Sequence, residues 1–176
     1  RTAFQGTLAW INGFESEDTF KMEKSFYGDC YAGALDRAKR FGYNFEMFWI
    51  GQKQMTGKRV SQILKTRNIL GVIVGPMPEV TENLSLDWED FNSVKIGHSL
   101  KDSRLTNVIS DQFQNTQRVL EKLYQDGFRR IGFACPKRVD VRVGNNFSGG
   151  YLSYVYHRLG GLPMPMFLDE DPEGDY

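Results

Sequence analysis

The sequence predicts an α/β fold built on a doubly wound parallel sheet, and three observations support this prediction. Short apolar segments alternate along the chain with segments whose apolar residues recur every three or four positions, the period of a helix. Glycine or asparagine follows several of these helical segments, as is common at helix ends. Strands that alternate with helices pair in parallel through right-handed crossovers. The length of 176 residues is sufficient to bury a core.

The first half of the chain contains the most regular strand–helix alternation. We expect strands at residues 6–11, 43–50 and 69–74, and helices at about residues 27–41 and 57–67. The first helix follows from apolar positions at steps of three and four.

Residue types at the ends of these helices support the assignment. Gly42 stands where a left-handed C-terminal cap belongs, and Asn68 is placed to end the second helix. Thr56 precedes the second helix and is a candidate N-cap.

The second half of the chain is less regular. We expect strands at residues 94–97, 130–134 and 166–168, an apolar fragment at residues 108–110, helices at residues 116–123 and 145–159, and a short helix near residues 84–91. Ligands of such sheets bind outside the carboxyl ends of the strands. The loops expected at that edge are residues 12–19, 51–55, 75–82, 97–104, 111–115 and 135–146.

Composition and motifs exclude several classes of function. Lys and Arg number 22 and Asp and Glu number 22, so the chain lacks the basic excess of a free-standing nucleic-acid-binding domain. Two cysteines do not make a disulfide scaffold. The sequence contains no P-loop, no Gly-x-Gly-x-x-Gly after the first strand and no Gly-x-Ser-x-Gly. His98 and His157 lack partners at zinc spacing, and Pro136 after Cys135 argues against an activated thiol. We therefore expect no catalytic residue, cofactor or metal.

Four segments in order resemble one family. Residues 126–133 read Asp-Gly-Phe-Arg-Arg-Ile-Gly-Phe, and residues 108–111 read Val-Ile-Ser-Asp. Residues 33–46 join a helix, a glycine cap and a strand, and residues 68–74 read Asn-Ile-Leu-Gly-Val-Ile-Val. Together they resemble the effector-binding region of the lac repressor/galactose repressor (LacI) family of bacterial transcription regulators.

The resemblance implies a periplasmic-binding-protein-like type I fold, in which two flavodoxin-like lobes hold a small, sugar-like effector between them. It implies an N-terminal lobe at residues 1–135, and a crossover helix with the start of a C-terminal lobe at residues 136–176. It also implies a cytoplasmic homodimer that contacts DNA, not a membrane, through a helix-turn-helix head. Because the chain starts without Met or a signal peptide, we expect it to be a piece of a longer protein from which that head is missing.

Carried over to this chain, the family pattern points to polar ligand contacts in the second half. Asp111 matches an aspartate at the end of a short strand, where it can accept hydrogen bonds from a polyol. The N-cap of the following helix is an alternative role. The family's effector-gripping Arg would stand at Phe147, so Arg142 and Asn146 just upstream are the candidate substitutes.

Aromatic residues make up 14% of the chain and supply the remaining candidates. Trp10, Phe14 and Trp49 lie at strand ends or in loops where their faces could stack on a sugar, with core packing as the alternative. The resemblance also points to a dimer interface at Tyr27, Tyr31, Trp88 and Phe91. For the two tyrosines, packing against the sheet is the alternative.

Two other functions share the predicted fold. A sugar-binding protein of an uptake system would carry a secretory leader before Arg1, whereas a regulator would carry a basic helix-turn-helix there. An α/β enzyme of flavodoxin-like topology would need a phosphate- or flavin-binding loop after a strand, and the sequence shows none.

Overall fold

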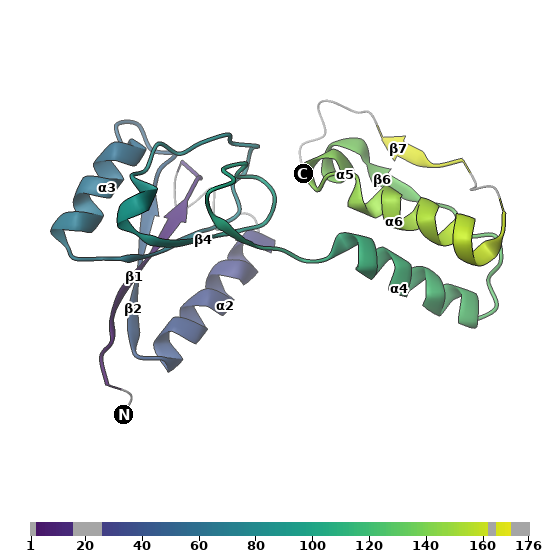
Figure 1. Ribbon diagram of the computed structural model, residues 1–176, viewed down its shortest axis with the longest axis horizontal. Helices are drawn as coiled ribbons and strands as arrows, with labels where there is room; N and C mark the ends of the chain where they lie inside the picture. The colour runs from purple at the N-terminus through teal and green to yellow at the C-terminus, as the bar shows by residue number, and fades with distance from the viewer. Residues whose placement is uncertain (1–2, 16–25, 162–164, 170–176) are drawn as a thin grey trace. The chain divides into compact units, whose positions relative to one another are not determined.

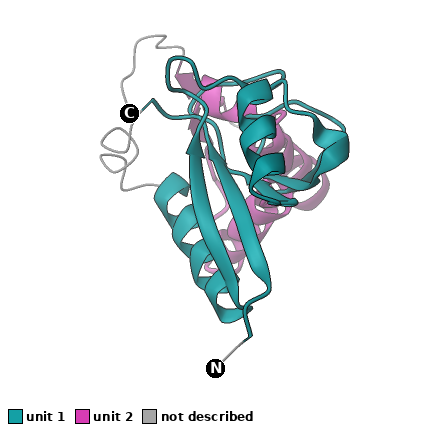
Figure 2. Ribbon diagram, turned by 90° about the vertical axis from the view of Figure 1, so that its left-hand side faces the viewer, with its two compact units in different colours: residues 1–109 teal, residues 110–176 magenta. Residues whose placement is uncertain are grey.

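The computed structural model describes residues 3–15, 26–161 and 165–169. The chain divides into two compact units, Arg1–Ile109 (unit 1) and Ser110–Tyr176 (unit 2), coloured separately in Figure 2. The boundary between the two units lies within the Val-Ile-Ser-Asp segment, between Ile109 and Ser110. The lobe boundary implied by the resemblance, at residues 135 and 136, stays a prediction.

Unit 1 is built on a parallel sheet of five strands in the order β2-β1-β3-β4-β5. The strands are β1 (Gly6–Asn12), β2 (Tyr43–Trp49), β3 (Gly71–Val74), β4 (Asn92–Ile96) and β5 (Thr106–Val108). The chain runs outward from β1 to β2, returns past β1 to β3 and then continues to the other edge. The predicted doubly wound α/β fold is thereby confirmed.

Two helices cover opposite faces of this sheet (Figure 1). Helix α2 (Phe26–Arg40) packs on the face that carries Trp10, and helix α3 (Gly57–Thr66) packs on the face that carries Ala9 and Ile11. The short helix expected near residues 84–91 is a single 3-10 turn, η1 (Trp88–Asp90).

The predicted helix ends are confirmed. After α2, Gly42 adopts φ +82°, the left-handed region in which glycine avoids the Cβ clash. The Thr56 hydroxyl accepts a hydrogen bond from the N–H of Arg59 at 3.3 Å and so caps α3. Asn68 ends α3 at φ +53°.

The main core of unit 1 lies between the sheet and α3. Its central members are Val60 and Leu64 of α3, packed on Val72 and Val74 of β3. Trp88 and Phe91 close this core from the η1 side. Burial of such side chains contributes about 1.5–3 kcal/mol each relative to leaving them exposed.

Unit 2 is built from helices α4, α5 and α6, a π-helical turn η2 and two short strands. Their bounds are β6 (Ala134–Pro136), β7 (Phe167–Asp169), α4 (Gln112–Gln125), α5 (Lys137–Arg142), α6 (Asn146–Tyr154) and η2 (Val155–Leu159). Helices α4 and α6 lie side by side (Figure 1), with Leu120, Tyr151 and Tyr154 buried between them. Strands β6 and β7 pair in parallel.

Two expectations for unit 2 are wrong in detail. The strand expected at residues 130–134 is displaced to Ala134–Pro136, because β7 pairs only with those residues. The loop expected at residues 135–146 contains helix α5. The helix expected at residues 145–159 is present as α6, which continues into the π-helical turn η2. This turn ends before Gly160, which adopts φ +61°.

Candidate functional site

A pocket of about 780 Å³ opens at the carboxyl ends of β1, β2 and β3 in unit 1. Its walls are the loops that follow these strands, at residues 13–15, 50–57 and 77–85. Strand order reverses between β1 and β3, since the chain leaves β1 toward β2 on one side and returns to β3 on the other. Ligand sites of doubly wound sheets form at this switch point. Residues of the predicted loops 12–19, 51–55 and 75–82 line the pocket, and residues 16–19 of the first lie outside the described part of the chain.

Backbone forms much of the pocket wall, because glycines allow the loops to approach closely. A Cβ added to Gly51 would lie 2.5 Å from the carbonyl oxygen of Gly13. One added to Gly13 would lie 2.4 Å from Met77 Sδ. Real Cβ atoms essentially never come this close, so a larger residue at Gly51 would push the β1 and β2 loops apart, whereas one at Gly13 would first displace the Met77 side chain.

The lining combines apolar surface with amides, hydroxyls and two carboxylates. The apolar members are Phe14, Ile50, Met55, Met77, Pro78 and Leu84. The polar members are Glu15, Gln52, Gln54, Thr56, Glu79, Thr81, Asn83 and Ser85. Amides, hydroxyls and carboxylates provide both donors and acceptors, while the apolar members offer contact surface. This combination suits a small molecule with a hydroxylated edge and an apolar face.

Phe14 is the aromatic candidate that lines the pocket. Its backbone N–H donates to Asn12 Oδ1 at 3.0 Å, and its ring meets the Tyr27 ring edge-on at a centroid distance of 5.0 Å. These contacts fix the turn after β1. The side chain is therefore both a wall of the pocket and part of the packing under α2.

Trp10 and Trp49 do not line this pocket. Trp10 is 1% exposed and packs against Tyr31 and Phe45, with the indole lying on Gly75. Trp49, the last residue of β2, is partly buried. The structure shows core packing for Trp10, and ligand contacts of either tryptophan stay predictions.

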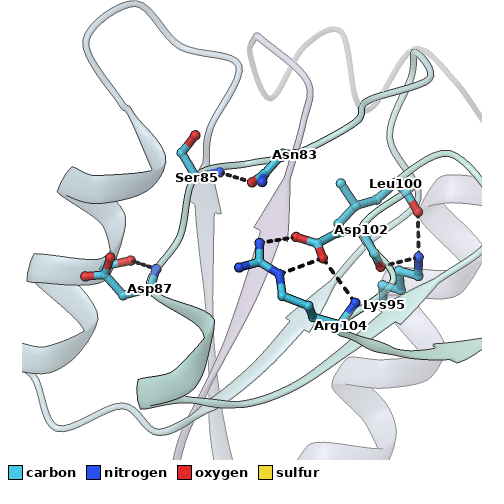
Figure 3. Close-up of polar contacts among 8 residues, drawn as sticks. Asn83, Ser85, Asp87, Lys95, Leu100, Asp102 and Arg104 are labelled. Atoms are coloured by element: carbon cyan, nitrogen blue, oxygen red, sulfur yellow. Dashed lines mark hydrogen bonds and ion pairs between the residues drawn. The ribbon is translucent and has the colours of Figure 1, made fainter.

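The pocket wall at residues 77–85, with Asp87 just beyond it, is fixed by hydrogen bonds to the neighbouring segments. The N–H of Met77 donates to Ser99 Oγ at 2.7 Å, and the N–H of Asp87 donates to Ser61 Oγ of α3 at 3.0 Å. Within the wall, the N–H of Ser85 donates to Asn83 Oδ1 at 2.6 Å (Figure 3). Long loops become suitable for binding when such bonds hold one conformation.

A charged network lies behind this wall, in and beyond β4. The Lys95 ammonium donates to the carbonyl oxygens of Leu100 at 2.8 Å and Asp102 at 2.7 Å (Figure 3). The Asp102 carboxylate accepts from Arg104 Nε at 2.9 Å and Nη2 at 2.6 Å. Burial lowers the pKa of Lys95, an effect that the Asp102 charge partly opposes. Hydrogen bonds from Arg104 lower the pKa of Asp102 to about 2.

The polar site candidates Asp111, Arg142 and Asn146 lie in unit 2. Asp111 is the N-cap of α4, where its Oδ1 accepts from the N–H of Gln114 at 2.9 Å, so its alternative role is confirmed. The short strand that it is expected to end is β5, which stops three residues earlier at Val108. Arg142 is the last residue of α5, and Asn146 is the first of α6. Ligand contacts of these three residues stay predictions.

Sequence reasoning missed Asp140, which organises the junction of α5 and α6. This residue is buried, and its Oδ1 accepts from the N–H groups of Phe147 and Ser148, each at 3.1 Å. Its carboxylate therefore caps α6 from the preceding helix. An acidic residue several positions before a helix is a weak sequence signal, since a cap normally adjoins the first turn.

The four residues predicted for a dimer interface pack within unit 1. Trp88 and Phe91 belong to its core, at 5% and 9% exposed. Tyr27 and Tyr31 meet Phe14 and Trp10 edge-on, as the alternative of packing against the sheet predicts. An interface role for these residues stays a prediction.

Metal binding, a reactive thiol and a membrane-spanning helix find no support in the described part of the chain. Within residues 3–15, 26–161 and 165–169, no three His, Cys, Asp or Glu side chains gather as a metal site would require. Burial raises the pKa of the Cys30 and Cys135 thiols, which disfavours the reactive thiolate. Among the described helices, none is long and apolar enough to span a bilayer.

The chain matches no protein-family model and no curated protein sequence. Several solved structures of transcription regulators are nevertheless similar. The trehalose repressor of Escherichia coli has a TM-score of 0.53 at 19% identity, over 86% of this chain and 55% of that one. A complex of the transcriptional regulator CelR with cellobiose has a TM-score of 0.60 at 16% identity, over 93% of this chain and 49% of that one.

A LacI-family regulator, CCPA of Weissella paramesenteroides with bound glucose, has a TM-score of 0.58 at 13% identity. The match covers 92% of this chain and 57% of that one. The chain thus spans about half the length of the solved structures it matches. Identities this low speak for the fold alone, and the chain has the periplasmic-binding-protein-like type I fold found in these transcription regulators.

Proposed function

We propose that this chain is part of the effector-sensing region of a LacI-type transcription regulator, and that the pocket of unit 1 binds a small, neutral, polyhydroxylated molecule. The observation that carries this proposal is the pocket at the β1/β3 switch point, with an aromatic ring and several amide and hydroxyl groups in its walls. Asp111, Arg142 and Asn146 of unit 2 are proposed as further effector contacts.

In this proposal the full-length protein is a cytoplasmic homodimer that binds DNA through a separate head. Effector binding would shift the population of sensor conformations and thereby change DNA affinity. Support comes from four similar solved structures described as transcription regulators or regulator-like, two of them as complexes with a sugar. The same support disfavours a sugar-binding protein of an uptake system, although that class shares the fold.

The first test is ligand binding by the full-length protein. Thermal unfolding and calorimetric titration are measured with trehalose, cellobiose, glucose, a nucleoside and a purine. A true effector raises the melting temperature by several degrees at a concentration of about 100 times Kd, because a ligand that binds only the folded state stabilises it by about 2.7 kcal/mol there. Absence of any response across the panel contradicts a neutral polyol site.

A pair of variants locates the site. Gln52→Ala removes a side chain that lines the pocket, whereas Gln62→Ala removes the same side chain from an exposed position on α3 away from it. Loss of a hydrogen bond to the effector weakens binding by about tenfold in the first variant and leaves the second unchanged. Equal affinities in both variants would place the effector elsewhere.

The regulatory part of the proposal has its own test. The full-length protein is used to select tight-binding sequences from random duplex DNA, and binding is then measured with and without the effector. We expect a specific sequence whose affinity the effector changes. Sugar binding without any specific DNA binding would instead favour the uptake function.

A further inference from the structure

Lys95 of β4 is a charged residue on a sheet face whose neighbouring side chains are apolar. It pairs with Val74 in the register of β3 and β4, and so lies on the sheet face of Val72 and Val74, whose side chains form the core under α3. The residue is only 7% exposed. Burying an ammonium group is unfavourable unless hydrogen bonds replace its water.

The two acceptors that replace water are both backbone carbonyls of one loop. Lys95 Nζ lies 2.8 Å from the carbonyl oxygen of Leu100 and 2.7 Å from that of Asp102. This loop joins β4 to β5 at residues 97–105 and contains no helix. The ammonium therefore holds the middle of a loop that has no secondary structure of its own (Figure 3).

The same loop holds the pocket wall. Thr81 forms a parallel bridge with Leu100: its N–H donates to the Ser99 carbonyl at 2.8 Å, and its carbonyl accepts from the N–H of Lys101 at 2.8 Å. The hydroxyl of Ser99 accepts from the N–H of Met77 at 2.7 Å. Met77 and Thr81 both line the pocket.

These contacts form a continuous chain from a buried cation to the binding surface. We propose that Lys95 is a positioning residue of the pocket: its ammonium fixes residues 97–105, and these fix the pocket wall at residues 77–81. The role in effector binding rests on the proposed function, whereas the tether itself does not. A wall fixed before the ligand arrives binds more tightly, because binding no longer has to order it.

The test compares Lys95→Met with Lys101→Met in the full-length protein. Methionine keeps the length and apolar stem of Lys95 but has no N–H to donate. Lys101 lies on the same loop, is exposed, and makes no side-chain hydrogen bond or ion pair in the described structure. Amide hydrogen exchange is followed at Met77, Thr81 and Lys101, with the amides of Val72 and Val74 as the core reference.

In Lys95→Met we expect the amides of the wall and the bridge to exchange about tenfold faster, the effect of one lost net hydrogen bond. The core amides keep their protection. The melting temperature stays level or rises, since an apolar residue suits this face better than a charge. Lys101→Met removes a like charge near Lys95 but no hydrogen bond, so it does not speed exchange at Met77 or Thr81. A merely structural role predicts the opposite pattern, a lower melting temperature with uniform loss of protection.

Effector affinity is measured on the same variants. We expect binding about tenfold weaker in Lys95→Met and unchanged in Lys101→Met. If wild-type protein binds none of the sugars while the exchange pattern appears as described, the proposed function fails and the tether stands. Unchanged protection at Thr81 and Lys101 in Lys95→Met overturns the inference. Should that variant not fold, Lys95→Gln decides: it keeps one shorter donor and is expected to loosen the same amides to a smaller extent.

Discussion

Replacement of Asp102 by asparagine removes the negative charge behind the pocket wall and leaves the size of the side chain unchanged. The Asp102 side chain is 5% exposed, and its carboxylate is paired with Arg104 at 2.6 Å. Asparagine keeps an oxygen for the N–H of Arg104, which donates to Asp102 Oδ1 at 3.1 Å, so the local turn survives. What the variant loses is the negative charge opposite the guanidinium and near Lys95.

The expected loss follows from the pKa of this carboxyl. It falls from 3.8 to about 2, with the Arg104 hydrogen bonds as the largest cause. One pKa unit corresponds to about 1.4 kcal/mol, so the full shift would amount to roughly 2.5 kcal/mol. The Arg104 side chain is 56% exposed, and solvent screens its half of the pair. We therefore expect Asp102→Asn to lower the free energy of unfolding by about 1–2 kcal/mol at pH 7.

The direction of the pH dependence is fixed by the sign of the shift. Because the folded-state pKa is depressed, the stabilisation is fully present above the unfolded-state value of 3.8 and is lost as the pH falls through about 2. The advantage of the wild type over Asp102→Asn is thus constant between pH 7 and pH 5 and shrinks below about pH 4.

Urea unfolding followed by tryptophan fluorescence measures this difference in unit 1, where Trp10, Trp49 and Trp88 all lie. The matched control is Asp36→Asn, which breaks the exposed Asp36–Arg40 pair of α2 (2.9 Å) and changes stability by less than about 0.5 kcal/mol at any pH. A difference between wild type and Asp102→Asn that is the same at pH 7 and pH 3, or that is absent at pH 7, would refute the reasoning.

Two further predictions concern backbone positions and the junction of unit 2. Gly57→Ala places a Cβ 1.8 Å from the Leu84 carbonyl oxygen and lowers the free energy of unfolding by about 1–3 kcal/mol. Gly33→Ala in α2 meets nothing within 4 Å and raises the free energy of unfolding by up to about 1 kcal/mol. Urea unfolding of both variants checks the two signs, and a Gly57→Ala variant as stable as the wild type would contradict the close approach. Asp140→Ala leaves two N–H groups of α6 without their acceptor and costs about 1–3 kcal/mol, while Asp140→Asn keeps Oδ1 and costs less. Amide exchange at Phe147 and Ser148 ranks these two variants, and equal protection in both would argue against the cap.

Local chemistry made much of the fold predictable. The left-handed Gly42, the Thr56 cap and the Asp111 cap each depend on a few neighbouring residues, so the sequence is sufficient to find them. The alternation of strands and helices also predicts the edge at which the pocket forms. Caps and strand–helix alternation thus predict the path of the backbone over one or two neighbouring elements.

The features that sequence reasoning missed depend on partners distant in the chain. Strand β6 begins at Ala134 because β7 pairs with it there, more than thirty residues later. Asp140 caps a helix that it does not adjoin. For Trp10 the sequence leaves sugar stacking and core packing both open, because its partners are distant in the chain: its position in β1 turns it under α2, where Gly75 leaves room for the indole.

Topology and side chains therefore contribute differently to the pocket. The strand order places the pocket at the β1/β3 edge, where doubly wound sheets bind their ligands. The shape of the wall at residues 77–85 depends instead on hydroxyls and a buried ammonium contributed by other elements, namely Ser61, Lys95 and Ser99. A buried charge adds little to stability and can reduce it. Its presence on the core face of β4 is better explained by the conformation that it imposes on one loop, which bonds the pocket wall and leads into β5.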